Sequence, residues 1–244
     1  MLNRFSKHLG LFRVGRRLRR LQRAYYRAPA KNEALIVDYF RALEHARSLT
    51  MPMPHGRCLH LGCEDHRIEG WINVDIVRTG AVDVQADLSR PLPFPDGAMD
   101  FIHSEDLLEH LEPDAGRTLL VECFRVLRPG GVMRLLTPDL EHLVTDVYLY
   151  PRARHLAWSD AYLGAPTPCE ALNAHCRMGG EHRFIYDFGH LARALESIGF
   201  RVRRTAWNRS RHPCLRYLDL RDFGLNLFLE ATKPATGNAA GEAP

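Results

Sequence analysis

Short apolar runs alternate with helical periodicity through the middle of this chain. The runs are four to six residues long and lie at 58–61, 71–76, 82–86, 99–103 and 132–136. Between the last two runs, apolar residues from 116 to 127 recur every three or four positions, which is the period of an amphipathic helix. Strands that alternate with helices in this way predict an α/β fold built on a parallel sheet.

The pattern resumes toward the C-terminus after an interruption. The segment at about 150–180 is rich in Pro, Ala, His and Arg, and we interpret it as an insertion after the fifth strand. Inserted segments of this kind often carry binding specificity. A helix is predicted at 188–198, and closing strands are predicted at 200–207 and 225–231.

Pro and Gly residues mark the borders of the folded part. A helical period at 33–49 is broken by Pro52, Pro54 and Gly56, so the main domain is expected to start near residue 57. Small and polar residues after 233 are typical of a disordered tail. The predicted organisation is a leader at 1–31, a helix and linker at 32–56, a main domain at 57–233 and a tail at 234–244.

Charge is divided unevenly along the chain. Residues 1–31 hold ten Lys or Arg and no Asp or Glu, which leaves 23 basic against 29 acidic residues in the remainder. Apolar residues interleaved with these cations are typical of an amphipathic helix on anionic lipid or on nucleic acid. A helix docked on the protein's own acidic face, or a solvated terminus, explains the same pattern. The leader is too densely charged for a signal peptide.

The cysteine pattern favours a reduced, cytoplasmic protein. The six cysteines form no Cys-x-x-Cys pair, and two of them fall in expected core elements, unlike a disulfide framework. Cys169, His175, Cys176 and His182 are near one another in sequence, but their spacing matches no familiar zinc finger or ribbon. We therefore predict no metal site. The expected location is the cytoplasm, or the inner face of the membrane if the leader binds lipid.

Glycine and acidic residues stand at the ends of the predicted strands. Gly62 follows the first strand, Asp75 closes the second, and Asp87 follows the third. In a parallel sheet, ligands bind outside the carboxyl ends of the strands, where the strand order reverses. A carboxylate after the second strand can accept hydrogen bonds from both hydroxyls of a ribose. A dinucleotide is disfavoured because the first turn lacks the further glycines that a pyrophosphate requires.

Six short motifs follow one another in the first half of the main domain. They are Leu61-Gly62-Cys63, Gly70-Trp71-Ile72-Asn73-Val74-Asp75, Ala86-Asp87-Leu88, Asp100-Phe101-Ile102-His103-Ser104, Leu108-Glu109-His110-Leu111 and Leu127-Arg128-Pro129-Gly130-Gly131-Val132. In this order they resemble the class I S-adenosylmethionine-dependent methyltransferases, in particular a small bacterial branch with Gly-Trp-x-Asn-Val-Asp after the first glycine turn. The likeness covers about residues 57–140, with weaker echoes at 181–187 and 191–200.

The resemblance implies a fold, a cofactor and a set of contacts. The fold is a Rossmann-like, doubly wound, mostly parallel seven-stranded sheet with helices on both faces, and the cofactor is S-adenosylmethionine. Asp75 would hold the ribose, Asp87 the adenine amino group, and Leu88 would lie against the adenine ring. The cofactor-binding residues implied by the family motifs are Gly62, Cys63, Asp75, Asp87, Leu88 and Ser104.

The catalytic candidates follow from the chemistry of methyl transfer. The reaction is an in-line displacement, so the protein mainly aligns the donor and the acceptor. A general base is needed only when the acceptor must lose a proton. We expect His182 to be that base because it follows a flexible Met-Gly-Gly stretch that could place it in the cleft, and Asp187 and His110 are further candidates. Support of the following helix by His182, and a structural role for His110, are the alternatives.

Two departures from the family motifs leave a second interpretation open. Members usually have an acidic or amide residue where His60 stands, and a second glycine where Glu64 stands. Glu64 brings a negative charge close to the expected position of the methionine carboxylate, and like charges at about 4 Å repel by roughly 1 kcal/mol in water. Glu64 therefore either points to solvent, or the chain is a catalytically silent binding protein of the same fold.

The acceptor is inferred only by association. The resembled branch often belongs with bacterial surface-polysaccharide systems, so a sugar or glycan precursor is the expected small-molecule acceptor. A nucleic-acid methyltransferase anchored by the leader is the alternative. It is less favoured because the body is acidic and shows no array of stacking aromatics. The pattern indicates no oligomeric state.

Overall fold

The computed structural model describes residues 57–220 and 224–235, together with residues 17, 20, 21 and 42. Predictions for most of the leader, for the helix at 33–49 and for the tail from 236 lie outside the described residues. The chain divides into two compact units. The first combines 1–52, 140–180 and 207–226, and the second combines 53–139, 181–206 and 227–244.

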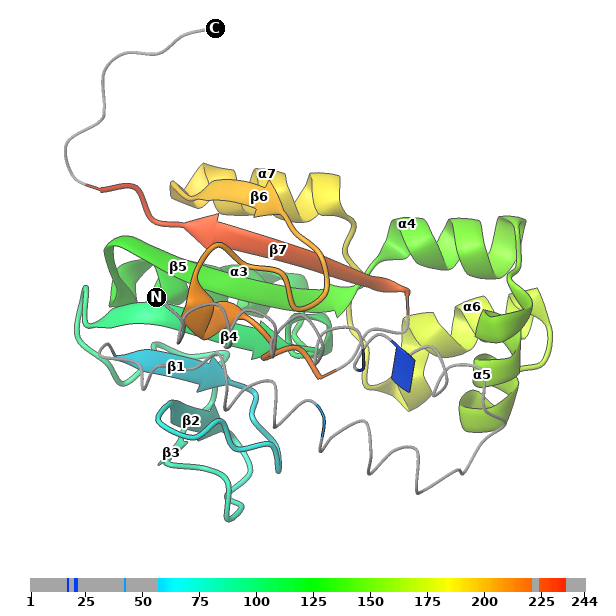
Figure 1. Cartoon of the computed structure of the whole chain (residues 1–244), viewed down its shortest axis with the longest axis horizontal. Helices are drawn as coiled ribbons and strands as arrows, with labels where there is room; N and C mark the ends of the chain where they lie inside the picture. The colour runs from blue at the N-terminus through cyan, green and yellow to red at the C-terminus, as the bar shows by residue number, and fades with distance from the viewer. Residues whose placement is uncertain (1–16, 18–19, 22–41, 43–56, 221–223, 236–244) are drawn as a thin grey trace, which may run out of the picture. The chain divides into compact units, whose positions relative to one another are not determined.

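The second unit contains a seven-stranded sheet with the strand order β3-β2-β1-β4-β5-β7-β6 (Figure 1). Pairings β1–β2, β1–β4, β2–β3 and β4–β5 are parallel, whereas β6 and β7 pair in antiparallel fashion. This order confirms the predicted Rossmann-like, mostly parallel sheet. The strands are β1 Cys58–Leu61, β2 Ile72–Asp75, β3 Val84–Gln85, β4 Met99–Glu105, β5 Leu127–Pro138, β6 Arg201–Arg204 and β7 Asn226–Thr232.

Two helices of this unit pack beside the sheet. Helix α3 (Pro113–Val126) begins with a proline, which fits the first turn because that residue needs no amide donor there. Helix α7 (Phe188–Ile198) ends at Gly199, whose φ of +115° favours glycine. α3 and α7 contact each other and share one hydrophobic core with the central strands. The connections from β1 to β2 and from β2 to β3 contain no helix.

Among the strands, β5 differs most from its predicted boundaries. The sequence predicts a turn before a strand at 132–136, but β5 starts at Leu127, immediately after α3. Gly130 has a φ of +78°, and a Cβ on Gly131 would lie 3.1 Å from the carbonyl oxygen of Asp100. The two glycines therefore let an irregular first half of the strand pass close to β4.

The first unit is helical where the sequence indicated only an insertion. Its elements are α4 Leu140–His142, the π-helix η2 Leu143–Leu149, α5 Ala153–Leu163, α6 Pro168–Arg177 and the 3₁₀ turns η3 Met178–Gly180 and η4 Pro213–Leu215. A capping box formed by Thr167 and Glu170 starts α6. In this unit the Nε2 atom of His175 lies 3.1 Å from Ser159 Oγ. No helix among the described residues is long and apolar enough to cross a membrane.

Candidate functional site

The carboxyl ends of three neighbouring strands meet at one edge of the sheet. Leu61 is in register with Val74 of β2 and with Ser104 of β4. The turn after β1, the end of β2 and the end of β4 therefore lie side by side. The chain order reverses between β1 and β4, and this reversal marks the ligand-binding crevice of doubly wound sheets.

Gly62 makes the sharp turn that leaves β1. Its φ is +68°, and its amide donates to the Val74 carbonyl at 2.9 Å. A Cβ at this position would lie 3.1 Å from two side-chain carbons of Leu107. Both the backbone conformation and the packing against Leu107 therefore require glycine here.

Asp75 is held in one orientation at the end of β2. One carboxylate oxygen, Oδ2, accepts the Glu64 amide at 2.9 Å, and the other, Oδ1, accepts the Val77 amide at 2.9 Å. The side chain is almost fully buried. A carboxylate has about four acceptor positions, so this arrangement leaves capacity for further donors such as hydroxyl groups.

Glu64 occupies a position whose backbone favours glycine. Its φ is +45°, in the left-handed region, and its carbonyl accepts a hydrogen bond from Thr79 Oγ1. The side chain is exposed, as the first of the two sequence interpretations required. The neighbouring Arg67 forms ion pairs with Glu69 and Asp83.

A buried polar layer lies beneath this edge. His60 Nδ1 lies 3.1 Å from Asn73 Oδ1, and the His60 ring centroid lies 5.4 Å from that of His103. The Asn73 amides donate to Asp83, and the backbone bond is the main cause that lowers the pKa of Asp83 to about 2. His60 therefore belongs to the interior support of the turn.

Two further predicted cofactor residues are interior residues. Cys63 is buried, and burial, followed by the charge of Asp75, raises the pKa of its thiol to about 11. Ser104 is buried within β4. All six cysteines of the chain are free in the structure.

Asp87 and Leu88 follow β3. Asp87 Oδ1 accepts bonds from the amide and the hydroxyl of Ser89, and these bonds are the main reason that the pKa of Asp87 is lowered. Arg90 pairs with the other oxygen of Asp87 at 3.2 Å. The Leu88 side chain is buried in the hydrophobic core. Their predicted contacts with adenine remain predictions.

The structure brings two of the three catalytic candidates together. The rings of His110 and His182 are 4.9 Å apart between centroids and lie edge to face. Glu109, at the same place, is fully buried and accepts a bond from Thr137 Oγ1 at 2.9 Å. The turn η1 (Leu108–His110), just beyond β4, carries Glu109 and His110.

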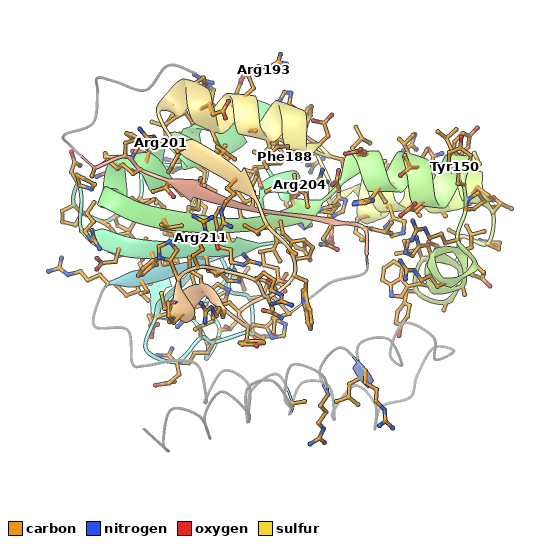
Figure 2. All side chains as sticks on the ribbon, turned by 45° about the horizontal axis from the view of Figure 1, so that its top comes forward. Tyr150, Phe188, Arg193, Arg201, Arg204 and Arg211 are labelled. Atoms are coloured by element: carbon orange, nitrogen blue, oxygen red, sulfur yellow. The ribbon has the colours of Figure 1, made fainter. Side chains whose placement is uncertain are left out.

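Asp187, the third candidate, is the N-cap of α7. Its Oδ1 accepts the His190 amide at 2.7 Å, which satisfies a free amide of the first turn. Next to this cap, Arg204 pairs with Asp139 at 2.6 Å and stands 5.4 Å above the ring of Phe188 (Figure 2). The contacts of Asp187 are those of a helix cap.

Comparisons with known proteins bear on this same part of the chain. The model of the family described as "Methyltransferase domain" matches residues 69–135. A Mycolicibacterium smegmatis protein named "Probable S-adenosylmethionine-dependent methyltransferase" is 41% identical over 58 residues, which are 24% of this chain. By these matches, the central part of the chain is similar to S-adenosylmethionine-dependent methyltransferases, and its sheet has the Rossmann-like strand order. This chain matches only 22% of the length of that relative.

Solved methyltransferase structures align with most of this chain at low sequence identity. A protein from Archaeoglobus fulgidus aligns over 83% of this chain and 100% of its own, with 18% identity and a TM-score of 0.47. A protein from Mesorhizobium loti aligns over 77% of this chain and 96% of its own, with 16% identity and a TM-score of 0.46. Both are titled S-adenosylmethionine-dependent methyltransferases.

The residues at the edge of the sheet fit the methyltransferase cofactor, S-adenosylmethionine. The Asp75 carboxylate is oriented by two amides and retains acceptor capacity, as contacts to ribose hydroxyls need. Sequence reasoning also allows Glu109, in Leu-Glu-His-Leu, as a possible general base after the fourth strand.

Proposed function

We propose that this chain transfers a methyl group from S-adenosylmethionine to a hydroxylated small molecule, with a sugar or glycan precursor as the preferred class. The observation that carries the proposal is the arrangement of Gly62 and Asp75 at the reversal of strand order. A sharp glycine turn and a carboxylate fixed by two amides stand on adjacent strands. This arrangement suits the ribose of a nucleoside cofactor.

Each part of the edge has a distinct task in this proposal. The cofactor supplies a methyl group on a positively charged sulfur. Asp75 binds the ribose, while Gly62 keeps the turn after β1 narrow enough to pass Leu107. Asp87 lies after β3, the edge strand next to β2, where the adenine would reach it. The protein acts mainly by holding donor and acceptor in line.

The acceptor is assigned to the side of the edge where β4 ends. His110 and His182 lie together there, with ring centroids 4.9 Å apart. A hydroxyl acceptor must lose a proton during transfer, and either ring can receive it. Asp187 is given a different task, the capping of α7.

Titration calorimetry with S-adenosylmethionine and S-adenosylhomocysteine tests the cofactor site. Wild-type protein is expected to bind in the micromolar range, about −8 kcal/mol. Asp75→Asn keeps the size of the side chain but sets an amide donor against a backbone amide, so affinity should fall at least about tenfold. Glu69→Gln, a change at a highly exposed carboxylate, is the matched control. Absence of binding to folded wild-type protein would support the silent binding protein instead.

Transfer itself is tested with a labelled methyl donor. Incorporation into a panel of sugars and lipid-linked sugars should depend on Asp75. Replacing His182 with Gln should reduce turnover while leaving cofactor binding unchanged, because the ring is assigned to the acceptor side. Labelling of RNA or DNA in place of sugars would overturn the assignment of the acceptor.

A further inference from the structure

Glu109, His110 and His182 form what we call the His–Glu cluster. One potential ligand atom from each residue lies within 4.8 Å of those from the other two. Two of the residues are neighbours on η1, and the third comes from a segment more than 70 residues later in the chain. Folding therefore brings two imidazoles and a carboxylate to a single point at the acceptor side of the edge.

The cluster is held in place by contacts outside it. The amides of Arg183 and Phe184 both donate to the Glu109 carbonyl, at 2.7 and 3.2 Å, and this fixes the segment that carries His182 against η1. The Glu109 carboxylate is oriented by Thr137 at 2.9 Å. Metal sites commonly have such outer hydrogen bonds to their carboxylate and imidazole ligands.

The donor atoms select a class of cation. Two nitrogens and one carboxylate oxygen suit zinc and other first-row transition metals. Magnesium and calcium prefer all-oxygen sites. Three protein ligands leave a coordination position for water or for an acceptor oxygen, which is the pattern of catalytic zinc sites.

The spacing permits binding after the ligand atoms move closer together. In a tetrahedral site, two ligands at about 2.1 Å from the ion lie about 3.4 Å apart. The three ligand atoms, which now lie within 4.8 Å of one another, must therefore approach by up to roughly 1.4 Å. His110 and His182 are only partly buried, so rotation of their rings can supply this movement.

We propose that the His–Glu cluster binds a divalent transition-metal ion, with zinc as the best-fitting cation, and that its open position faces the acceptor. The orientation of the open position toward the acceptor rests on the proposed function, whereas binding of the ion does not. His182 is then a ligand, which replaces its role as general base.

Zinc titration of tag-free protein tests the site directly. Wild-type protein should bind one equivalent, and affinity should fall at least about tenfold in His110→Ala and in His182→Ala. His66→Ala, a change at an exposed histidine outside the cluster, is the control and should bind as wild type. Thr137→Val should weaken binding about tenfold or more, because it removes only the bond that orients Glu109.

Two further measurements separate the possible outcomes. Cobalt at the site should give visible absorption that His182→Ala removes, which identifies ligation independently of activity. S-adenosylmethionine affinity should be unchanged in every cluster variant. Zinc binding that is absent in wild type, or that is equal in wild type and both histidine variants, would overturn the proposal. Either result would leave the cofactor assignment unaffected, because that assignment is tested separately by Asp75→Asn.

Discussion

Replacing Glu64 separates a backbone effect from a charge effect at the edge of the sheet. Its φ of +45° places a residue with a Cβ in the left-handed region, which costs roughly 1–2 kcal/mol. Glycine removes that cost but loses roughly 0.5–1 kcal/mol more conformational entropy on folding. Glu64→Gly should therefore stabilise the protein by about 0.5–1 kcal/mol, whereas Glu64→Ala keeps the Cβ and should change stability little.

The same two variants test how the negative charge of Glu64 affects cofactor affinity. Both remove a carboxylate that lies near the expected methionine end of the cofactor, where repulsion at about 4 Å is roughly 1 kcal/mol in water. S-adenosylmethionine should therefore bind about fivefold more tightly to both variants than to the wild type. The affinity of either variant for adenosine derivatives that lack the methionine carboxylate should equal that of the wild type.

Thermal unfolding and calorimetry on the three proteins give the required comparison. For a chain of this size, the expected stabilisation of Glu64→Gly corresponds to a rise of about 1–4 °C in Tm. Equal Tm values for the Gly and Ala variants would refute the strain argument. Unchanged cofactor affinity in both variants would refute the charge argument, and would also remove the reason for regarding the chain as catalytically silent.

Three further outcomes follow from the buried contacts. Gly62→Ala should destabilise the protein by about 1–3 kcal/mol in urea unfolding, since the new Cβ meets Leu107 and the backbone is left-handed; a neutral result would contradict this packing. Glu230→Gln should cost about 3 kcal/mol or more, because the fully buried Arg134 and also Arg203 pair with that carboxylate; a loss below 1 kcal/mol would show that the charge is not needed. Burial, and then the neighbouring Arg154, lowers the pKa of His155 from 6.5 to about 4, so the unfolded chain takes up the proton first. Stability should therefore fall as the pH drops from about 6.5 to about 4, and His155→Gln should reduce this fall in a pH series of melts.

Local patterns were sufficient for the strands and for the two sheet helices. β1 is fully buried, and the end of β2 carries the acidic residue that the alternating pattern placed there. The start of α7 was also readable, because Asp187 stands directly before the helical period and caps it. The helices at 140–180 were missed although Thr167-Pro168-Cys169-Glu170 is a capping-box sequence before one of them. The segment was interpreted from its overall composition, and the capping-box sequence was not used.

The sequence by itself determined where the central strands lie along the chain, the glycine turn after β1 and the acid at the end of β2, since each depends on neighbours a few residues away. Only the tertiary structure decided which polar residues meet. The His–Glu cluster depends on two amide bonds from 183 and 184 to the Glu109 carbonyl, and no spacing in the sequence encodes a contact across that separation. The same holds for the backbone amide of Glu64, which donates to the Asp75 carboxylate eleven residues later in the chain.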